Sequence, residues 1–183
     1  MLFAFLVLAV FFEIQANITA RLFHNNMPGL HLYTLIEMII FSFVYYLNWS
    51  TKKILRLLII INAIVFIAIA IADAFFINGL NAPNTNSRPY AAVSLTIYAL
   101  VYFYDLFKAD SSLYSWQRPM FWFSISVLLY FGINTFYFML ANYLFNTYMI
   151  GNISSYSHAA INILSNCLIA QAFKCHRHLT MES

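Results

Sequence analysis

Long apolar runs, each ended by a short polar stretch, dominate this 183-residue chain. A run of roughly 20 apolar residues can cross the hydrocarbon core of a bilayer as an α-helix. Glycine and proline fall mostly in or beside the stretches between the runs, as expected of turns and loops. The pattern predicts an all-α protein, a polytopic transmembrane helical bundle forming a single transmembrane domain over residues 1–183. The six predicted helices cover residues 2–22, 30–49, 54–77, 89–107, 119–145 and 148–173.

Proline and glycine mark the predicted helix ends. The stretch MPG at 27–29 predicts the first turn, and NGLNAPNTNSRP at 78–89 predicts the third loop. Pro89 and Pro119 stand where helices are predicted to begin, a position at which the missing amide proton costs nothing. Among the glycines and prolines, only Gly132 is expected to interrupt a span.

Composition supports the membrane interpretation. Hydrophobic residues make up 63% of the chain and charged residues only 8%, against about 25% charged in soluble domains. The expected partner is therefore the lipid bilayer. The net charge of +3, without a basic block, argues against nucleic acid. No nucleophile or metal motif is visible. We therefore assign no catalytic residues, metal or cofactor, and an enzyme is the less favoured class.

Basic residues predict the orientation. Lys and Arg are more frequent in cytoplasmic loops, and seven of the nine fall on one side of the predicted bundle, whereas Arg21 and Arg88 fall on the other. Both termini are therefore predicted to be cytoplasmic. The seven on the cytoplasmic side are Lys52, Lys53, Arg56, Lys108, Arg118, Lys174 and Arg177.

Several titratable residues lie inside the predicted spans. At 1.5 Å per residue, Glu13 lies near the bilayer midplane, while Glu37 and His158 lie slightly to its outer side. Asp73 lies nearer the outer end of the third helix, and Arg88 lies at the outer start of the fourth. Charge exposed to hydrocarbon is costly, so these side chains are predicted to face the bundle interior, protonated, paired or hydrated.

Helical spacing groups polar residues into stripes. The stripes are Glu13, Asn17, Arg21 and His24 on the first helix, Thr34, Glu37, Phe41, Tyr45 and Asn48 on the second, and Ser155, His158, Asn162, Ser165 and Ile169 on the sixth. The candidates for ligand binding or proton relay are Glu13, Asn17, Glu37, His158, Asn162, Asp73 and Arg88.

Structural alternatives stay open for these residues. Asn side chains in membrane helices often only hydrogen-bond neighbouring helices. Asp73 and Arg88 fit an ion pair near the outer surface as well as a ligand contact. Glu13, Glu37 and His158 are a possible metal-ligand set, but they are far apart in sequence and no metal is assigned.

Four segments carry a resemblance: HLYTLIEMIIFSF, NTNSR (84–88), RPMFWFSISVLLYFG (118–132) and SHAAINILSN (157–166). Together they resemble a group of uncharacterised polytopic membrane proteins of Gram-negative bacteria, with Glu37, Asn84, Arg88, Pro119 and His158 at the motif positions. The resemblance implies the bacterial inner (cytoplasmic) membrane. Members of the group commonly carry one more helix ahead of the first, which is compatible with this chain's being a shortened form.

Three function classes remain open. The first is a module that binds a small ligand or a proton in an outward-facing polar pocket and signals through a partner protein. The second is a small transporter or channel, working as a single chain or as a homo-oligomer, with Glu13 and Glu37 as a proton or cation relay. The third is an intramembrane lipid-modifying enzyme. The first is favoured, because no internal repeat supports a carrier and no nucleophile supports an enzyme.

Overall fold

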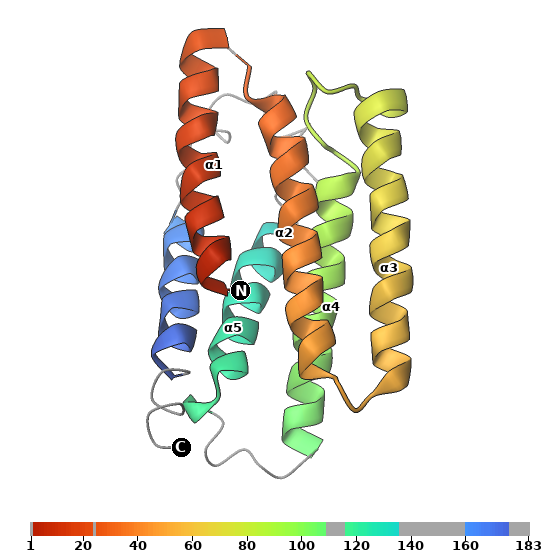
Figure 1. Ribbon diagram of the computed structural model, residues 1–183, viewed down its shortest axis with the longest axis vertical. Helices are drawn as coiled ribbons and strands as arrows, with labels where there is room; N and C mark the ends of the chain where they lie inside the picture. The colour runs from red at the N-terminus through yellow and green to blue at the C-terminus, as the bar shows by residue number, and fades with distance from the viewer. Residues whose placement is uncertain (1, 24, 109–115, 136–159, 176–183) are drawn as a thin grey trace. The chain divides into compact units, whose positions relative to one another are not determined.

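The computed structural model describes residues 2–23, 25–108, 116–135 and 160–175, and all regular structure in them is helical. The all-α prediction is confirmed. The elements are α1 (Leu2–Phe23), α2 (Met27–Asn48), α3 (Lys53–Ala72), the π-helical turn η1 (Asp73–Ile77), α4 (Ser87–Lys108), α5 (Pro119–Val127) and the π-helical turn η3 (Leu128–Gly132) (Figure 1). A further helix covers residues 160–175.

Three helices in the described part are long and apolar enough to cross a membrane: Met27–Asn48, Lys53–Ile77 and Ser87–Lys108. They match the second, third and fourth predicted spans, and α1 covers the first. The described parts of the fifth and sixth predicted spans are helical, and residues 136–145 and 148–159 lie outside the described residues. A membrane protein is thus supported, while the count of six spans and the side on which the termini lie stay predictions.

The start of α2 corrects one predicted turn. The stretch at 27–29 was expected to be the turn, but the helix already begins at Met27, with Pro28 in its first turn. Proline is favoured there because its fixed φ suits a helix and no amide hydrogen bond is lost. The Met27 amide donates to the side-chain oxygen of Asn25 at 2.9 Å. By contrast, Pro119 begins α5 as predicted.

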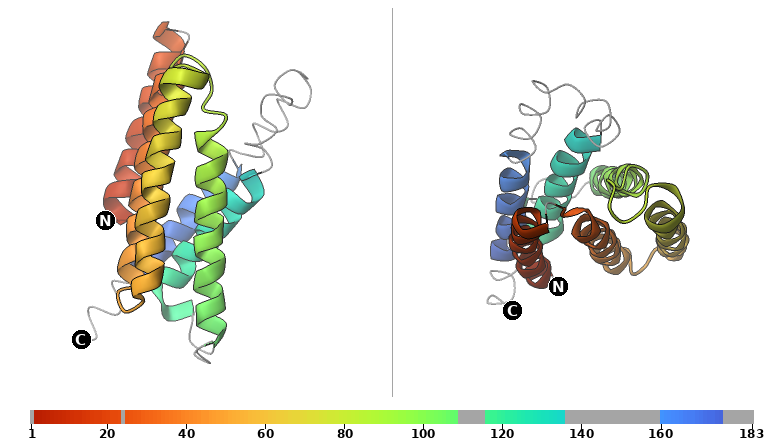
Figure 2. Two further views of the ribbon diagram at one scale, coloured as in Figure 1. Left: turned by 90° about the vertical axis from the view of Figure 1, so that its right-hand side faces the viewer. Right: turned by 90° about the horizontal axis from the view of Figure 1, so that it is seen from above.

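The chain divides into two compact units, residues 1–91 and 92–183. In the first unit, α2 packs against α1 and against α3, and successive helices run antiparallel (Figures 1 and 2). The α1–α2 turn and the loop at residues 78–86 therefore lie at the same end. The Asn25 amide donates to the Asn81 side-chain oxygen at 3.0 Å, and His31 Nε2 donates to the Ala82 carbonyl at 3.0 Å.

Burial differs sharply between the helices of this unit. On α2, Met38, Phe41 and Tyr45 are buried, which places one face of the helix against its neighbours. On α3, Ile59 and Phe66 are buried, whereas most of its large apolar side chains are exposed. An exposed apolar surface of this extent marks a membrane or partner interface, and it suits a helix that faces lipid.

In the second unit, a hydroxyl pair joins α5 to the helix at residues 160–175. Ser126 Oγ lies 2.7 Å from Ser165 Oγ and donates to the Ser165 carbonyl at 2.9 Å. Both serines are buried. Trp122 Nε1 donates to the Trp116 carbonyl at 2.7 Å, which holds the segment before α5 against that helix.

Candidate functional site

A buried ion pair joins α2 to the start of α4 in the first unit. Arg88 Nη1 lies 2.5 Å from Glu37 Oε2, and Glu37 is only 3% exposed. The second oxygen, Oε1, accepts a hydrogen bond from Tyr33 Oη at 2.9 Å. Tyr33 is one helical turn before Glu37, so its side chain lies on the same face of α2. The carboxylate is therefore neutralised by one cation and hydrogen-bonded at both oxygens.

Thr34 connects this ion pair to the loop before α4. Its hydroxyl oxygen accepts from Asn84 Nδ2 at 2.8 Å and from Arg88 Nη1 at 3.3 Å, and it donates to the Leu30 carbonyl at 2.9 Å. Thr34 and Asn84 are both buried. A buried polar group is costly unless it is hydrogen-bonded, and these contacts satisfy the threonine hydroxyl.

Asp73 forms a second cluster, at the N-terminus of α4. Its Oδ2 accepts from the backbone amides of Asn86 and Ser87, at 3.2 and 3.0 Å, and from Ser87 Oγ at 2.9 Å. Its Oδ1 accepts from Asn86 Nδ2 at 2.9 Å and from Asn78 Nδ2. A helix N-terminus attracts negative charge through its unpaired amides and its dipole. Asp73 thus caps α4 from a different helix.

The end of α3 places this aspartate. Asp73 begins the π-helical turn η1, and its carbonyl accepts from the amides of Asn78 and Gly79 at 3.0 and 3.3 Å. Gly79 has a φ of +80°, a conformation that glycine adopts readily because it lacks a Cβ. The wider turn and the glycine end the helix, and Asp73 is fully buried. π-turns of this kind are frequent at functional sites.

Adjacent residues of α4 hold the two clusters. Ser87 bonds to Asp73 from η1, and Arg88 pairs with Glu37 from α2. The first turn of α4 is thereby attached to two carboxylates on two other helices. Tyr90, in the same turn of α4, donates its hydroxyl to the Asn62 side-chain oxygen on α3 at 2.5 Å, so this asparagine hydrogen-bonds a neighbouring helix.

The predicted site residues are only partly described. Glu37, Asp73 and Arg88 lie in the two clusters. Glu13 and Asn17 lie on α1, but their side chains are outside the described part, as is the whole of His158. Asn162 accepts from Asn166 Nδ2 at 3.2 Å within the second unit. The predicted meeting of Glu13, Glu37 and His158 therefore stays a prediction.

Two details differ from expectation. The Arg88 ion pair is with Glu37, whereas Asp73 accepts its hydrogen bonds from Asn78, Asn86 and Ser87. In the stripe on α2, four residues are buried, but Asn48 at the end of the helix is exposed.

Several contributors were absent from the predicted site. The spacing of Tyr33 from Glu37, i and i+4 on one helix, could have pointed to it. Asn86 and Ser87 come just before Pro89, a typical signal for a helix start with a polar cap. No local signal predicts Asn78, because its contact depends on the path of the loop.

Comparisons with known proteins assign neither a family nor a function to this chain. Protein-family models, curated proteins and solved structures give no match to this chain. Among the described residues, no group of three His, Cys, Asp or Glu side chains is placed to hold a metal ion.

Proposed function

We propose that the chain is an integral membrane module that responds to a small ligand or a proton at the Glu37–Arg88 pair and passes the change to a partner protein. The proposal includes six spans in a bacterial inner membrane, with both termini cytoplasmic and the clusters near the outer surface. Glu13, Asn17, His158 and Asn162 are the proposed further contributors.

The observation that supports this proposal is the position of Arg88. It pairs with Glu37 on α2 while lying in the first turn of α4, next to Ser87, which bonds to Asp73. An anionic ligand that competes for Arg88, or a proton on Glu37, would weaken the attachment of this turn to α2. α4 is 22 residues long, or about 33 Å at 1.5 Å per residue, enough to carry a displacement across the membrane.

The test uses the full chain in sealed liposomes with Lys108, the last residue of α4, replaced by cysteine and both native cysteines replaced by serine. The labelling rate of that cysteine by a thiol probe is measured while the external pH is changed. We expect the rate to follow external pH in the parent and to become insensitive to it in Glu37→Gln. The matched control is Asp105→Asn, which removes a carboxylate on α4 outside the two clusters and should preserve the response.

Proton or cation flux across the same liposomes separates the classes. If the parent conducts protons or cations and either Glu37→Gln or Glu13→Gln abolishes this flux, the chain is a transporter or channel and the sensing proposal is replaced. A labelling rate that ignores pH in the parent, and also ignores added small carboxylates, would contradict the sensing proposal.

A further inference from the structure

An apolar groove runs between α2 and α3, away from the two polar clusters. It has a volume of about 390 Å³, within the roughly 300–1,000 Å³ typical of small-ligand sites. The lining residues are Ile39, Ser42, Phe43, Tyr46, Ile59, Ile60, Ala63, Ile64 and Ile67. All but Ser42 and Tyr46 are purely apolar, so the groove suits a hydrocarbon chain.

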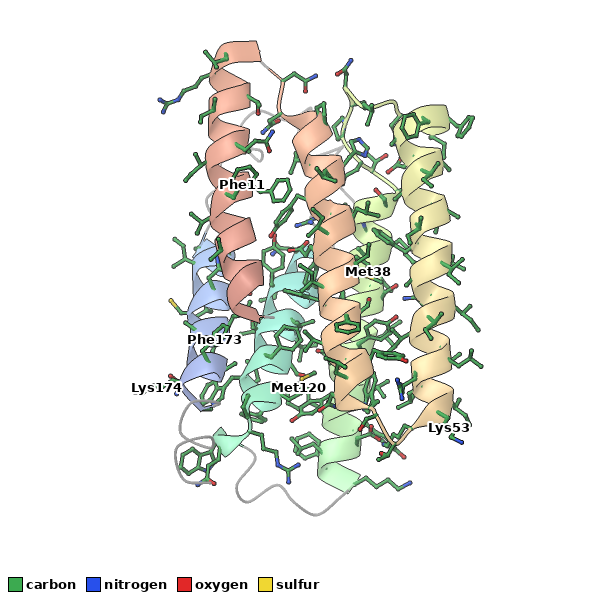
Figure 3. All side chains as sticks on the ribbon, in the orientation of Figure 1. Phe11, Met38, Lys53, Met120, Phe173 and Lys174 are labelled. Atoms are coloured by element: carbon green, nitrogen blue, oxygen red, sulfur yellow. The ribbon has the colours of Figure 1, made fainter. Side chains whose placement is uncertain are left out.

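Basic residues lie at one end of the groove. Tyr46, the lining residue nearest the α2–α3 turn, has the Arg56 guanidinium over its ring, with Cζ 4.0 Å from the ring centroid. Arg56 also donates to the Tyr46 hydroxyl and, at 3.3 Å, to the Ser50 carbonyl. Its Nε is buried without a hydrogen-bond partner. Lys52 and Lys53 are exposed at the start of α3, and Figure 3 shows Lys53 at that end of the helix.

We propose that this groove binds an anionic phospholipid, with one acyl chain along α2 and α3 and the phosphate at Lys52, Lys53 and Arg56. Charge complementarity selects the headgroup, since clustered Lys and Arg beside a membrane helix attract anionic lipids. The position at the predicted cytoplasmic side agrees with this, because the negative surface potential is found on that leaflet.

The lining chemistry argues against a helix as the occupant. Helix interfaces in membranes are enriched in small residues that let the backbones approach. Only Ser42 and Ala63 are small here, and the rest of the α3 side of the groove consists of isoleucines. Branched side chains leave a shallow channel that a flexible acyl chain can follow. The inference does not depend on the proposed sensing role.

The test counts phospholipids bound to the purified full chain by native mass spectrometry in neutral detergent. Phosphatidylglycerol is titrated against phosphatidylcholine, with inorganic phosphate as a third ligand. We expect saturable binding of one phosphatidylglycerol and much weaker binding of phosphatidylcholine. Lys53→Ala should weaken the anionic lipid about fivefold, the usual contribution of one basic residue near a membrane surface, whereas Lys108→Ala should leave it unchanged.

A second pair of variants tests whether the acyl chain lies in the groove. Ala63→Phe fills the groove and should abolish binding, whereas Ala68→Phe adds the same ring to an exposed position of α3 outside the groove and should have little effect. Equal binding of the two phospholipids, full competition by inorganic phosphate, or no difference between the two Phe variants would overturn the proposal. So would a protein dimer that Ala63→Phe dissociates, since the groove would then hold a second copy of this chain.

Discussion

The Glu37–Arg88 pair allows a strict test through a double-mutant cycle with Glu37→Met, Arg88→Met and the double variant. Arg88→Met leaves the Glu37 carboxylate buried without its cation, and Glu37→Met leaves the guanidinium without its carboxylate. Removing one partner of a buried ion pair costs roughly 3–5 kcal/mol. Replacing both partners by apolar residues of similar size is often close to neutral.

The structure sets the expected size of the remaining penalty. In the double variant, Tyr33 loses its bond to Glu37 Oε1 and Thr34 loses the donor Arg88. Thr34 keeps Asn84 and the Leu30 carbonyl. Losing a partner costs a fully buried group about 1–3 kcal/mol, and Tyr33 is only half-buried, so the remaining penalty is smaller than the cost of breaking the ion pair. We therefore expect the double variant to be more stable than either single variant.

Reversible unfolding of the purified chain, titrated with a denaturing detergent and followed by helical circular dichroism, measures these free energies. Lys53→Met is the control, since removing an exposed cation should change stability by no more than about 0.5 kcal/mol. Single-variant costs that simply add in the double variant would refute the argument. They would mean that the two side chains do not stabilise one another.

Three further variants examine other contacts. Asp73→Asn should lower the unfolding free energy by about 1–3 kcal/mol, because one of the two accepting oxygens becomes an NH2 group that faces other donors. Hydrogen exchange at the Asn86 backbone amide should accelerate in the same variant. Gly79→Ala should cost about 1–2 kcal/mol because of its positive φ, and thermal unfolding of the pure protein would detect this; an unchanged midpoint would contradict it. Ser126→Ala should lower the unfolding free energy by only about 0.6 kcal/mol, the mean for hydrogen bonds between membrane helices. A loss of several kcal/mol in the same unfolding assay would contradict this and show that the contact with Ser165 contributes more than a typical interhelical hydrogen bond.

The apolar runs and the prolines and glycines at their ends predicted the helices well because both signals are local. The limits of α1, α3 with η1, and α4 lie within two residues of those predicted, and the missed start of α2 came from treating Pro28 as part of a turn. The burial of Glu37 also followed from local information. Its spacing from Thr34 and Phe41 puts all three on one face of a helix.

The ion pair itself could not be derived in this way. Glu37 and Arg88 are 51 residues apart, and Asp73 was an equally reasonable partner for the arginine. The choice depends on the loop at residues 78–86 and on η1, which turns the aspartate toward the amides before α4. Neither a π-turn nor the path of a loop has a distinct pattern in a single sequence. The long arginine side chain adds to the ambiguity, since it can reach charges at several depths.

The charges around the first turn of α4 depend on one another. A cation at a helix N-terminus is disfavoured by the helix dipole, typically by about 0.3–1 kcal/mol, yet Arg88 occupies such a position. Two carboxylates offset this, because Asp73 accepts from the amides at the helix start while Glu37 pairs with the guanidinium. Loss of either negative charge would leave the arginine less stable in this turn. Polar contacts between α2, η1 and α4, rather than apolar packing alone, therefore set where α4 begins, because each carboxylate attaches a neighbouring residue of its first turn to a different helix.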